Sequence, residues 1–281
     1  YAELRQLDAA LTTPGSDFHI QVKNLYDLLI KPVKSQLQTK RLLICPDKLL
    51  SDLPFDILTD TMPADIKDYS KYPYLIKKYA IGYDYSAFTH YKCMNAPKKT
   101  YSFDFISFAP YWKILSEELI ETLSNEQKTL ARKLLKRSKE EVDIAGRLRG
   151  NARHQPFLDR EATLDTFYRY ASLARILHVS SHAIFDGKQP GNSFILFYPN
   201  GTDGSSLSLR DVYNMKIPSE MVVLSACETL KGNWKEGEGM FTWGKAFSHS
   251  GALSVFASRW NAHEETSIGM VELFYKNLPD Q

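Results

Sequence analysis

Two short apolar runs in the second half of the chain have the pattern of buried strands. Ile176, Leu177 and Val179 form the apolar part of residues 175–181, residues 221–224 are all apolar, and both runs end in small residues. Strands that are apolar on both faces are typical of parallel sheets covered by helices on either side. The two runs therefore predict neighbouring parallel strands within such a sheet.

Strand-like and helix-like segments alternate along the rest of the chain. Helices are expected at residues 16–39, 160–172, 239–249 and 264–277. Further strands are expected at residues 42–45, 79–85, 103–108, 193–198 and 252–258. The strand at 193–198 and the segment 207–209 are expected to form a hairpin-like excursion through residues 199–201. This alternation predicts an α/β fold with a mostly parallel central sheet and helices on both faces.

Charge and hydropathy narrow the class of partners. The 281 residues carry a formal net charge of +2, which gives no support to a nucleic-acid or membrane-surface partner. No apolar run approaches the roughly 20 residues that a membrane span needs. A basic run at residues 128–139 is followed directly by Glu140 and Glu141, so we interpret it as a solvated helix face.

The chain has three cysteines, and their spacing argues against a disulfide framework. Cys45, Cys93 and Cys227 are odd in number and far apart, and no CxxC pair suggests zinc. This usage fits a protein of the reducing cytoplasm. Cys45 and Cys93 are expected to be small buried or half-buried side chains.

Reactive residues follow both apolar runs. His182 comes directly after the first run, and Cys227 comes directly after the second. Adjacent parallel strands bring such residues to the same edge of a sheet, where open α/β folds place their sites. An imidazole beside a thiol can accept its proton, and the thiolate is the nucleophile. The pair predicts the chemistry of a thiol hydrolase.

A metal site is the alternative for the two histidines of this region. On a strand, the four steps from His178 to His182 span about 13 Å, too far for one zinc ion. The residues around His178 are strand-like, and no Glu lies between the histidines, so this is not an HExxH helix. We therefore expect no metal here and interpret His178 as structural.

Several blocks of sequence carry a family resemblance. Those nearest the reactive residues are 178–182 and 224–229, and further blocks in order are 41–49, 53–58, 237–239, 246–247, 251–252, 258–260 and 274–278. Together they closely resemble the CHAT family, a caspase-related group of cysteine peptidase domains that is also related to separase. The resemblance covers roughly residues 20–281.

The resemblance implies a caspase-like fold with a His–Cys dyad. His182 would act as general base and Cys227 as the nucleophile that forms an acyl-enzyme with a protein substrate. The backbone N–H groups of Ala183 and Cys227 are implied as oxyanion donors. The family often has Gly where Ala183 stands, but alanine keeps the N–H group and loses only backbone freedom. Such dyads need no third acid, metal or organic cofactor.

Three further residues are candidates for the substrate pocket: Glu238, Arg259 and Trp260. Glu238 lies in a Gly-Glu-Gly motif of the family and is expected to cap the following helix or to orient the loop after Cys227. Arg259 facing the pocket would favour an acidic residue before the scissile bond. Arg259 facing solvent would leave acidic groups to select Lys or Arg, and both alternatives remain open.

The expected organisation is an N-terminal helical segment over residues 1–40, followed by the CHAT domain over residues 41–281. Residues 113–150, rich in Lys, Glu and Leu, are expected to form one or two surface helices and are a candidate inserted regulatory segment. The chain begins at Tyr1 rather than Met, so an upstream region is expected. The family is usually joined to tetratricopeptide repeats, which implies regulation by such a region or by a regulatory protein.

The predicted function is a cytoplasmic cysteine endopeptidase. A caspase-like scaffold that binds a partner protein without catalysis would carry the same motifs. A nucleotide-binding α/β domain is a further alternative, but the chain has neither GxxxxGK[ST] nor a strand-linked GxGxxG. Reaction with a thiol-directed peptidyl electrophile separates the first two functions.

Overall fold

The computed structural model divides the chain into two compact units. They are Tyr1–Asn95 and Ala96–Gln281. The structure describes residues 18–110, 125, 137–149, 153–184, 186, 189–200, 205–226, 233–235, 239–258 and 264–279. No helix among these residues combines the length and hydropathy needed to cross a membrane.

The first unit joins a helix to a two-stranded parallel sheet. Helix α2 spans Phe18–Leu29, β1 (Arg41–Ile44) pairs with β2 (Ala80–Tyr83), and α3 spans Ala87–Met94. The core of this unit contains, among others, the buried side chains of Val22, Leu25, Phe55, Leu58 and Leu75. The helical segment and the first strand thus share one core.

The helix predicted at residues 16–39 is wrong in its second half. Helix α2 ends at Leu29, and Lys31–Gln36 forms a 3₁₀ helix with Pro32 near its start. Proline lacks the N–H that continues an α-helix, and its ring clashes with the preceding turn. Pro32 therefore ends the α-helix and tightens the next turn.

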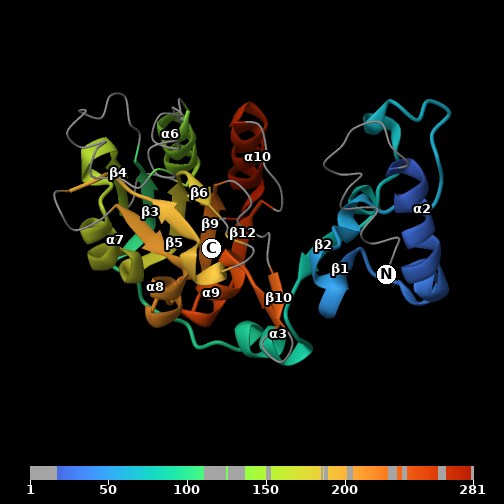
Figure 1. Cartoon of the computed structure of the whole chain (residues 1–281), viewed down its shortest axis with the longest axis horizontal. Helices are drawn as coiled ribbons and strands as arrows, with labels where there is room; N and C mark the ends of the chain where they lie inside the picture. Colours follow the sequence, from blue (N-terminus) through green and yellow to red (C-terminus); the bar gives the residue numbers. More distant parts are fainter. Residues whose placement is uncertain are drawn as a thin grey trace. The chain divides into compact units, whose positions relative to one another are not determined.

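The second unit is built on a five-stranded parallel sheet in the order β12-β9-β5-β3-β4 (Figure 1). Its strands in chain order are β3 (Phe103–Ala109), β4 (His154–Leu158), β5 (Ala174–Ser180), β9 (Met221–Ser225) and β12 (Val255–Ala257). The predicted parallel sheet is confirmed. The sequence did not predict β4, because Pro156 and polar residues interrupt its apolar pattern; Pro156 is tolerated since β4 is an edge strand.

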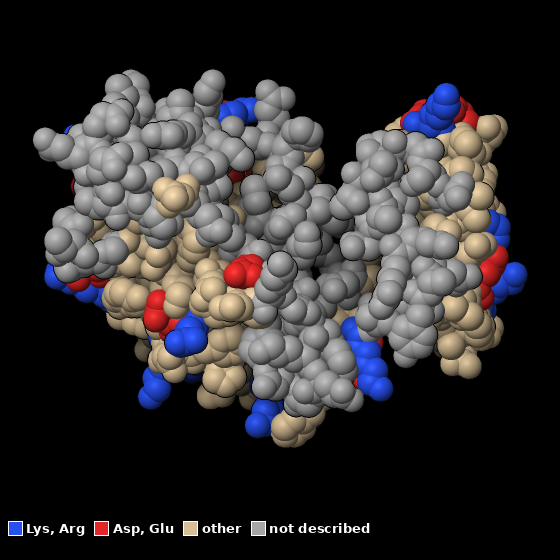
Figure 2. Space-filling model, in the orientation of Figure 1, with Lys and Arg blue, Asp and Glu red and all other residues tan. Residues whose placement is uncertain are grey.

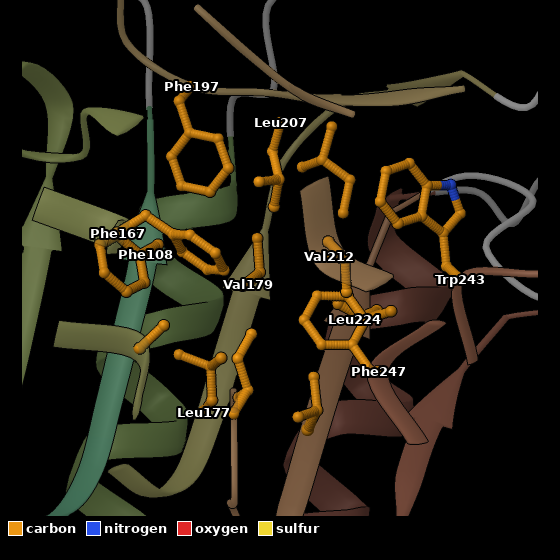
Figure 3. Close-up of a cluster of buried hydrophobic side chains, with 14 of the residues drawn as sticks. Phe108, Phe167, Leu177, Val179, Phe197, Leu207, Val212, Leu224, Trp243 and Phe247 are labelled. Atoms are coloured by element: carbon orange, nitrogen blue, oxygen red, sulfur yellow. The ribbon is translucent and has the colours of Figure 1, made fainter. Parts of the chain in front are cut away.

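Helices cover both faces of this sheet, as predicted. Helices α6 (Ser138–Leu148) and α10 (Glu264–Asn277) bury a cluster that includes Phe105, Val223 and Tyr275. Helices α7 (Leu164–Tyr170), α8 (Leu209–Asn214) and α9 (Trp243–His249) cover the other face. Figure 3 shows the cluster on that second face, to which Leu177, Val179 and Leu224 of the sheet and Trp243 and Phe247 of α9 belong. Alternate residues of β5 and β9 thus face different helix layers.

A small antiparallel sheet follows the central strand β5. It consists of β6 (Ala183–Ile184), β7 (Phe194–Leu196) and β8 (Ser206–Ser208). The pairing of β7 with β8 confirms the predicted hairpin-like excursion. Among the residues predicted as surface helices at 113–150, the structure describes mainly 137–149, where α6 lies; the remainder of that segment falls outside the described residues except Asn125.

The helix predicted at residues 239–249 is wrong in its first turn. Gly239–Phe241 forms β11, which pairs with β10 (Asn233–Lys235), and α9 begins only at Trp243. Thr242 caps this helix, since its side chain accepts a hydrogen bond from the N–H of Lys245. Thr242 thus takes the capping position, one of the two roles that we expected for Glu238, which itself lies outside the described residues.

Charged side chains of both signs are interspersed on the described surface. Figure 2 shows this mixing on one face of the molecule. Arg153 pairs with Asp104 at 2.6 Å and Lys78 pairs with Asp60 at 2.8 Å. Exposed ion pairs of this kind contribute little to the stability of the fold. Because each pair joins opposite charges, the net charge around it is small.

Candidate active site

The carboxyl ends of β5 and β9 lie level with each other. Ser180 and Ser225 are direct partners in the parallel ladder, and the N–H of Ser181 donates to the carbonyl of Ser225 at 3.2 Å. This confirms the prediction that the two apolar runs are neighbouring parallel strands. His182 follows Ser180 by two residues, and Cys227 follows Ser225 by the same number. The strands that lead to His182 and Cys227 therefore end at the same edge of the sheet.

His182 is held between the sheet and the small antiparallel hairpin. It is half-buried, and its carbonyl accepts the N–H of Leu196 at 2.8 Å. Ala183 follows as the first residue of β6 and is buried. Backbone bonds on both sides of His182 thus fix where its ring leaves the chain.

The backbone N–H of Ala183 points away from β7. The bond from Leu196 to His182 makes Ala183 and Ile195 a non-hydrogen-bonded pair of the antiparallel ladder. Residues at such positions direct their N–H groups away from the partner strand, and β6 is an edge strand. This orientation is compatible with an oxyanion donor.

The other predicted site residues lie outside the described residues. These are Cys227, Glu238, Arg259 and Trp260. The structure does describe Ala226 and Ser258, the neighbours of Cys227 and Arg259. The hydroxyl of Ser258 donates to the carbonyl of Ala226 at 2.8 Å, which ties the end of β12 to the end of β9.

Sequence analysis missed a buried carboxylate beneath this edge. Glu141 of α6 is 3% exposed, and its Oε1 lies 2.8 Å from Nε2 of His178. Its Oε2 accepts hydrogen bonds from the hydroxyls of Ser225, at 2.9 Å, and of Ser180, at 3.3 Å. Glu141 therefore bonds to both strands that lead to His182 and Cys227.

Both ring nitrogens of His178 have hydrogen-bond partners. The Tyr275 hydroxyl lies 3.0 Å from Nδ1, and burial, followed by the nearby Glu141 carboxylate, raises the Tyr275 pKa well above its usual value of 10. A carboxylate oxygen can only accept, so the Nε2–H of His178 donates to Glu141. His178 is fully buried, which confirms its structural interpretation.

No sequence signal identified this network, because its members are far apart in the chain. Glu141 stands beside an exposed Glu140 after a basic run, which favours a solvated helix face. One feature of the helix is informative: residues four apart lie on the same helical face, so Glu141 lies on the face of Ala145, whose side chain is buried. This spacing places Glu141 on the buried face but names none of its partners.

A cavity of about 120 Å³ lies at the same edge of the sheet. The ends of β5, β9 and β12 form one wall, and α6 and α10 contribute the others. Glu141 and several serine hydroxyls supply its polar surface, and side chains such as Phe256 and Met270 supply its apolar surface.

The two described cysteines have environments that disfavour the thiolate. Partial burial, followed by the Asp84 carboxylate, raises the pKa of both Cys45 and Cys93. Cys93 is half-buried, but Cys45 is exposed, so its expected burial was wrong. Within the described residues, no group of three His, Cys, Asp or Glu side chains could hold a metal ion.

Fold and site together define the class of protein. A parallel sheet flanked by helices, with the reactive segments at the carboxyl ends of adjacent central strands, is the arrangement of a caspase-like domain. The CHAT domain model matches residues 19–281, so the chain belongs to the CHAT family, as the sequence predicted. That family consists of caspase-like, peptidase-related domains.

Other comparisons add little to this assignment. A search of curated proteins finds no match. Among solved structures, a flavodoxin of Streptococcus pneumonia TIGR4 matches with 13% sequence identity and a TM-score of 0.30. The match covers 61% of this chain and 94% of the flavodoxin. At that TM-score the likeness carries no argument about function.

Proposed function

We propose that this protein is a cysteine endopeptidase in which His182 and Cys227 form the catalytic dyad. The observation that carries the proposal is the register of β5 and β9, in which Ser180 pairs with Ser225. His182 and Cys227 each follow this pair by two residues in the sequence. Parallel strands in such register lie about 4.8 Å apart, so residues just beyond their ends are within reach of each other.

In the proposed acylation step, His182 accepts the thiol proton of Cys227. The thiolate attacks the carbonyl carbon of the scissile peptide bond and forms a tetrahedral intermediate with a negatively charged oxygen. The imidazolium of His182 then gives its proton to the leaving nitrogen. The carbon–nitrogen bond breaks, the amine product leaves, and the acyl group remains as a thioester on Cys227.

Deacylation reverses the proton movements with water as the nucleophile. His182 accepts a proton from water while the oxygen attacks the thioester carbonyl. Collapse of the second tetrahedral intermediate breaks the carbon–sulfur bond and releases the carboxylic acid product. The sulfur recovers a proton, which restores the starting enzyme without any metal or organic cofactor.

The backbone N–H groups of Ala183 and Cys227 are the proposed oxyanion donors. The ladder position of Ala183, which turns its N–H away from β7, supports this role. Each such donor typically contributes about 10²–10³ in rate. Glu238, Arg259 and Trp260 remain proposed contributors to the substrate pocket.

Regulation and location form part of the same proposal. We place the enzyme in a reducing cytoplasm, acting on a protein substrate under the control of a tetratricopeptide-repeat region or a regulatory protein. The family resemblance supports this control. On that basis the isolated 281-residue chain should hydrolyse peptides weakly until its activator is present.

The test is covalent labelling with a peptidyl acyloxymethyl ketone, followed by intact-mass measurement and peptide mapping. We expect one adduct on Cys227, absent in Cys227→Ala and strongly slowed in His182→Ala. Cys45→Ala and Cys93→Ala are matched controls and should label normally. Labelling that persists undiminished in Cys227→Ala would sink the proposal and favour a non-catalytic interaction scaffold.

A further inference from the structure

The cavity lies at the carboxyl ends of β5 and β9, from which the chain continues toward the proposed catalytic residues. Ser181 and Ala226 line it, and they are the residues that directly precede His182 and Cys227. Ser258 lines it from the end of β12. A peptide held for attack by Cys227 would therefore have this cavity next to its scissile bond.

The size of the cavity suits the end of one side chain. Its volume is about 120 Å³. A dry engineered cavity of about 150 Å³ holds a benzene molecule. Phe256 and Met270 give it apolar surface against which a methylene stem can pack.

Four of the serine hydroxyls that line the cavity donate their protons to other groups of the protein. Those of Ser180 and Ser225 are donated to Glu141. That of Ser181 is donated to the carbonyl of Leu196, and that of Ser258 to the carbonyl of Ala226. A serine hydroxyl has one proton and two lone pairs, so the capacity left at these oxygens is to accept hydrogen bonds. These four oxygens therefore favour an occupant that brings hydrogen-bond donors.

The charged lining of the cavity also favours an occupant that brings hydrogen-bond donors. Glu141 lines the cavity, and its Oε1 lies 2.8 Å from Nε2 of His178. No Lys, Arg or His is among the described residues that line the cavity, and the basic side chain that contacts Glu141 from behind the cavity wall is His178. Buried carboxylates are normally paired with cations. The described lining of the pocket thus combines a carboxylate with acceptor oxygens and contains no basic side chain.

We propose that this cavity receives the side chain of a Lys or Arg residue next to the scissile bond, with Glu141 as the residue that determines this specificity. The inference rests on the proposed peptidase function and names its substrate class. It also favours one of the two alternatives that the sequence left open for Arg259, namely the one in which acidic groups select a basic residue.

The first experiment compares acyloxymethyl ketone probes that differ only in the residue attached to the ketone. The residues are arginine, its neutral isostere citrulline, lysine, norleucine and aspartate, and the readout is the rate of Cys227 labelling in the full chain. We expect the arginine or the lysine probe to label Cys227 at least about tenfold faster than each neutral or acidic probe. The reason is that a probe without matching donors leaves the hydrogen-bond acceptors of the site unpaired. Faster labelling by aspartate or norleucine would overturn the inference.

Variants of α6 identify the residue responsible. Glu141→Gln should reduce the arginine-to-citrulline rate ratio several-fold while changing the norleucine rate much less. Glu140→Gln is the matched control, since Glu140 is the adjacent residue of the same helix and pairs at the surface with Arg137. An unchanged ratio in folded Glu141→Gln would remove Glu141 from the specificity role. If that variant does not fold, the wild-type ratio still decides the substrate class.

A second experiment separates failure of the pocket from failure of the peptidase proposal. Agmatine carries a guanidinium on a four-carbon stem, and N-carbamoylputrescine is its neutral counterpart. Using ligand-observed NMR on Cys227→Ala protein, we expect agmatine to bind several-fold more tightly than the neutral compound. This result without any Cys227 labelling would overturn the peptidase and leave a cation pocket. Equal or absent binding of both compounds would overturn the pocket.

Discussion

Cys227 is the residue on which the proposed chemistry depends most directly. Cys227→Ala should lower peptide hydrolysis by on the order of 10³-fold or more, because no other group can form the thioester. Peptide hydrolysis by the activated protein, measured as kcat/KM, checks this. Cys45→Ala and Cys93→Ala should retain activity, since partial burial and Asp84 keep their thiols protonated. A fully active Cys227→Ala protein would contradict the prediction.

His154 on the edge strand gives a pH dependence to folding. Burial is the main cause that lowers its pKa, with His178 adding to the effect and Asp143 opposing it. The unfolded chain, with an ordinary histidine pKa near 6.5, therefore binds the proton more readily than the folded chain. The free energy of unfolding should fall as the pH drops below about 6.5 and level off below the folded-state pKa.

Urea unfolding between pH 7 and pH 5 tests this dependence. His154→Gln should flatten the slope, because glutamine does not titrate and can still bond to the Ser107 hydroxyl, which lies 3.1 Å from Nε2 of His154. Asp143→Asn should steepen it, since removing that carboxylate lowers the folded-state pKa further. A slope unaffected by either change would assign the dependence to other groups.

At the scale of elements, two helical glycines should respond oppositely to alanine. In α6, a Cβ at Gly146 would lie 2.3 Å from Cε1 of His154, so the ring must move and its bond to Ser107 is lost. In α10, a Cβ at Gly269 meets nothing within 4 Å. Gly146→Ala should destabilise by about 1–3 kcal/mol, whereas Gly269→Ala should stabilise by about 0.5–1 kcal/mol.

Urea midpoints of the two variants, compared with the wild type at one pH, measure these effects. The pair controls for alanine's helix propensity, since the same substitution is made in both helices. A stabilised Gly146→Ala protein would show that α6 and β4 are not in close contact there.

The sequence predicted well those elements whose own hydrophobic pattern is sufficient to identify them. Residues 221–226 are apolar on both faces, so a buried parallel strand was the natural interpretation, and α10 matches its predicted bounds of 264–277. Strand β4 was missed because Pro156 and its polar neighbours depend on β3 for their conformation. Glu141 was missed for the same reason: its partners lie 37 and 84 residues away in the chain. Local patterns do not encode such pairings.

At the scale of the whole molecule, each compact unit has its own apolar core. The cluster around Leu25 and Phe55 lies within the first unit, and the clusters on both faces of the five-stranded sheet lie within the second. Units with separate cores can in principle fold alone. A fragment of residues 96–281 should therefore unfold cooperatively by itself.

Thermal unfolding followed by near-ultraviolet circular dichroism tests this, because the signal reports packing around Trp243 and its neighbours. The full chain should show a transition that coincides with that of the fragment, and a fragment of residues 18–95 should supply any additional one. A fragment 96–281 without a cooperative transition would mean that the first unit is required to fold the second.

The level ends of β5 and β9 also limit how the length of this chain can vary. Each added residue advances a strand by about 3.3 Å and turns the next side chain to the opposite face. One residue inserted within Met221–Ser225 would shift every following position out of step with Ser180, Glu141 and His182. In a library of random single-residue insertions selected for Cys227 labelling, survivors should be depleted within both strands and enriched in the connections around them.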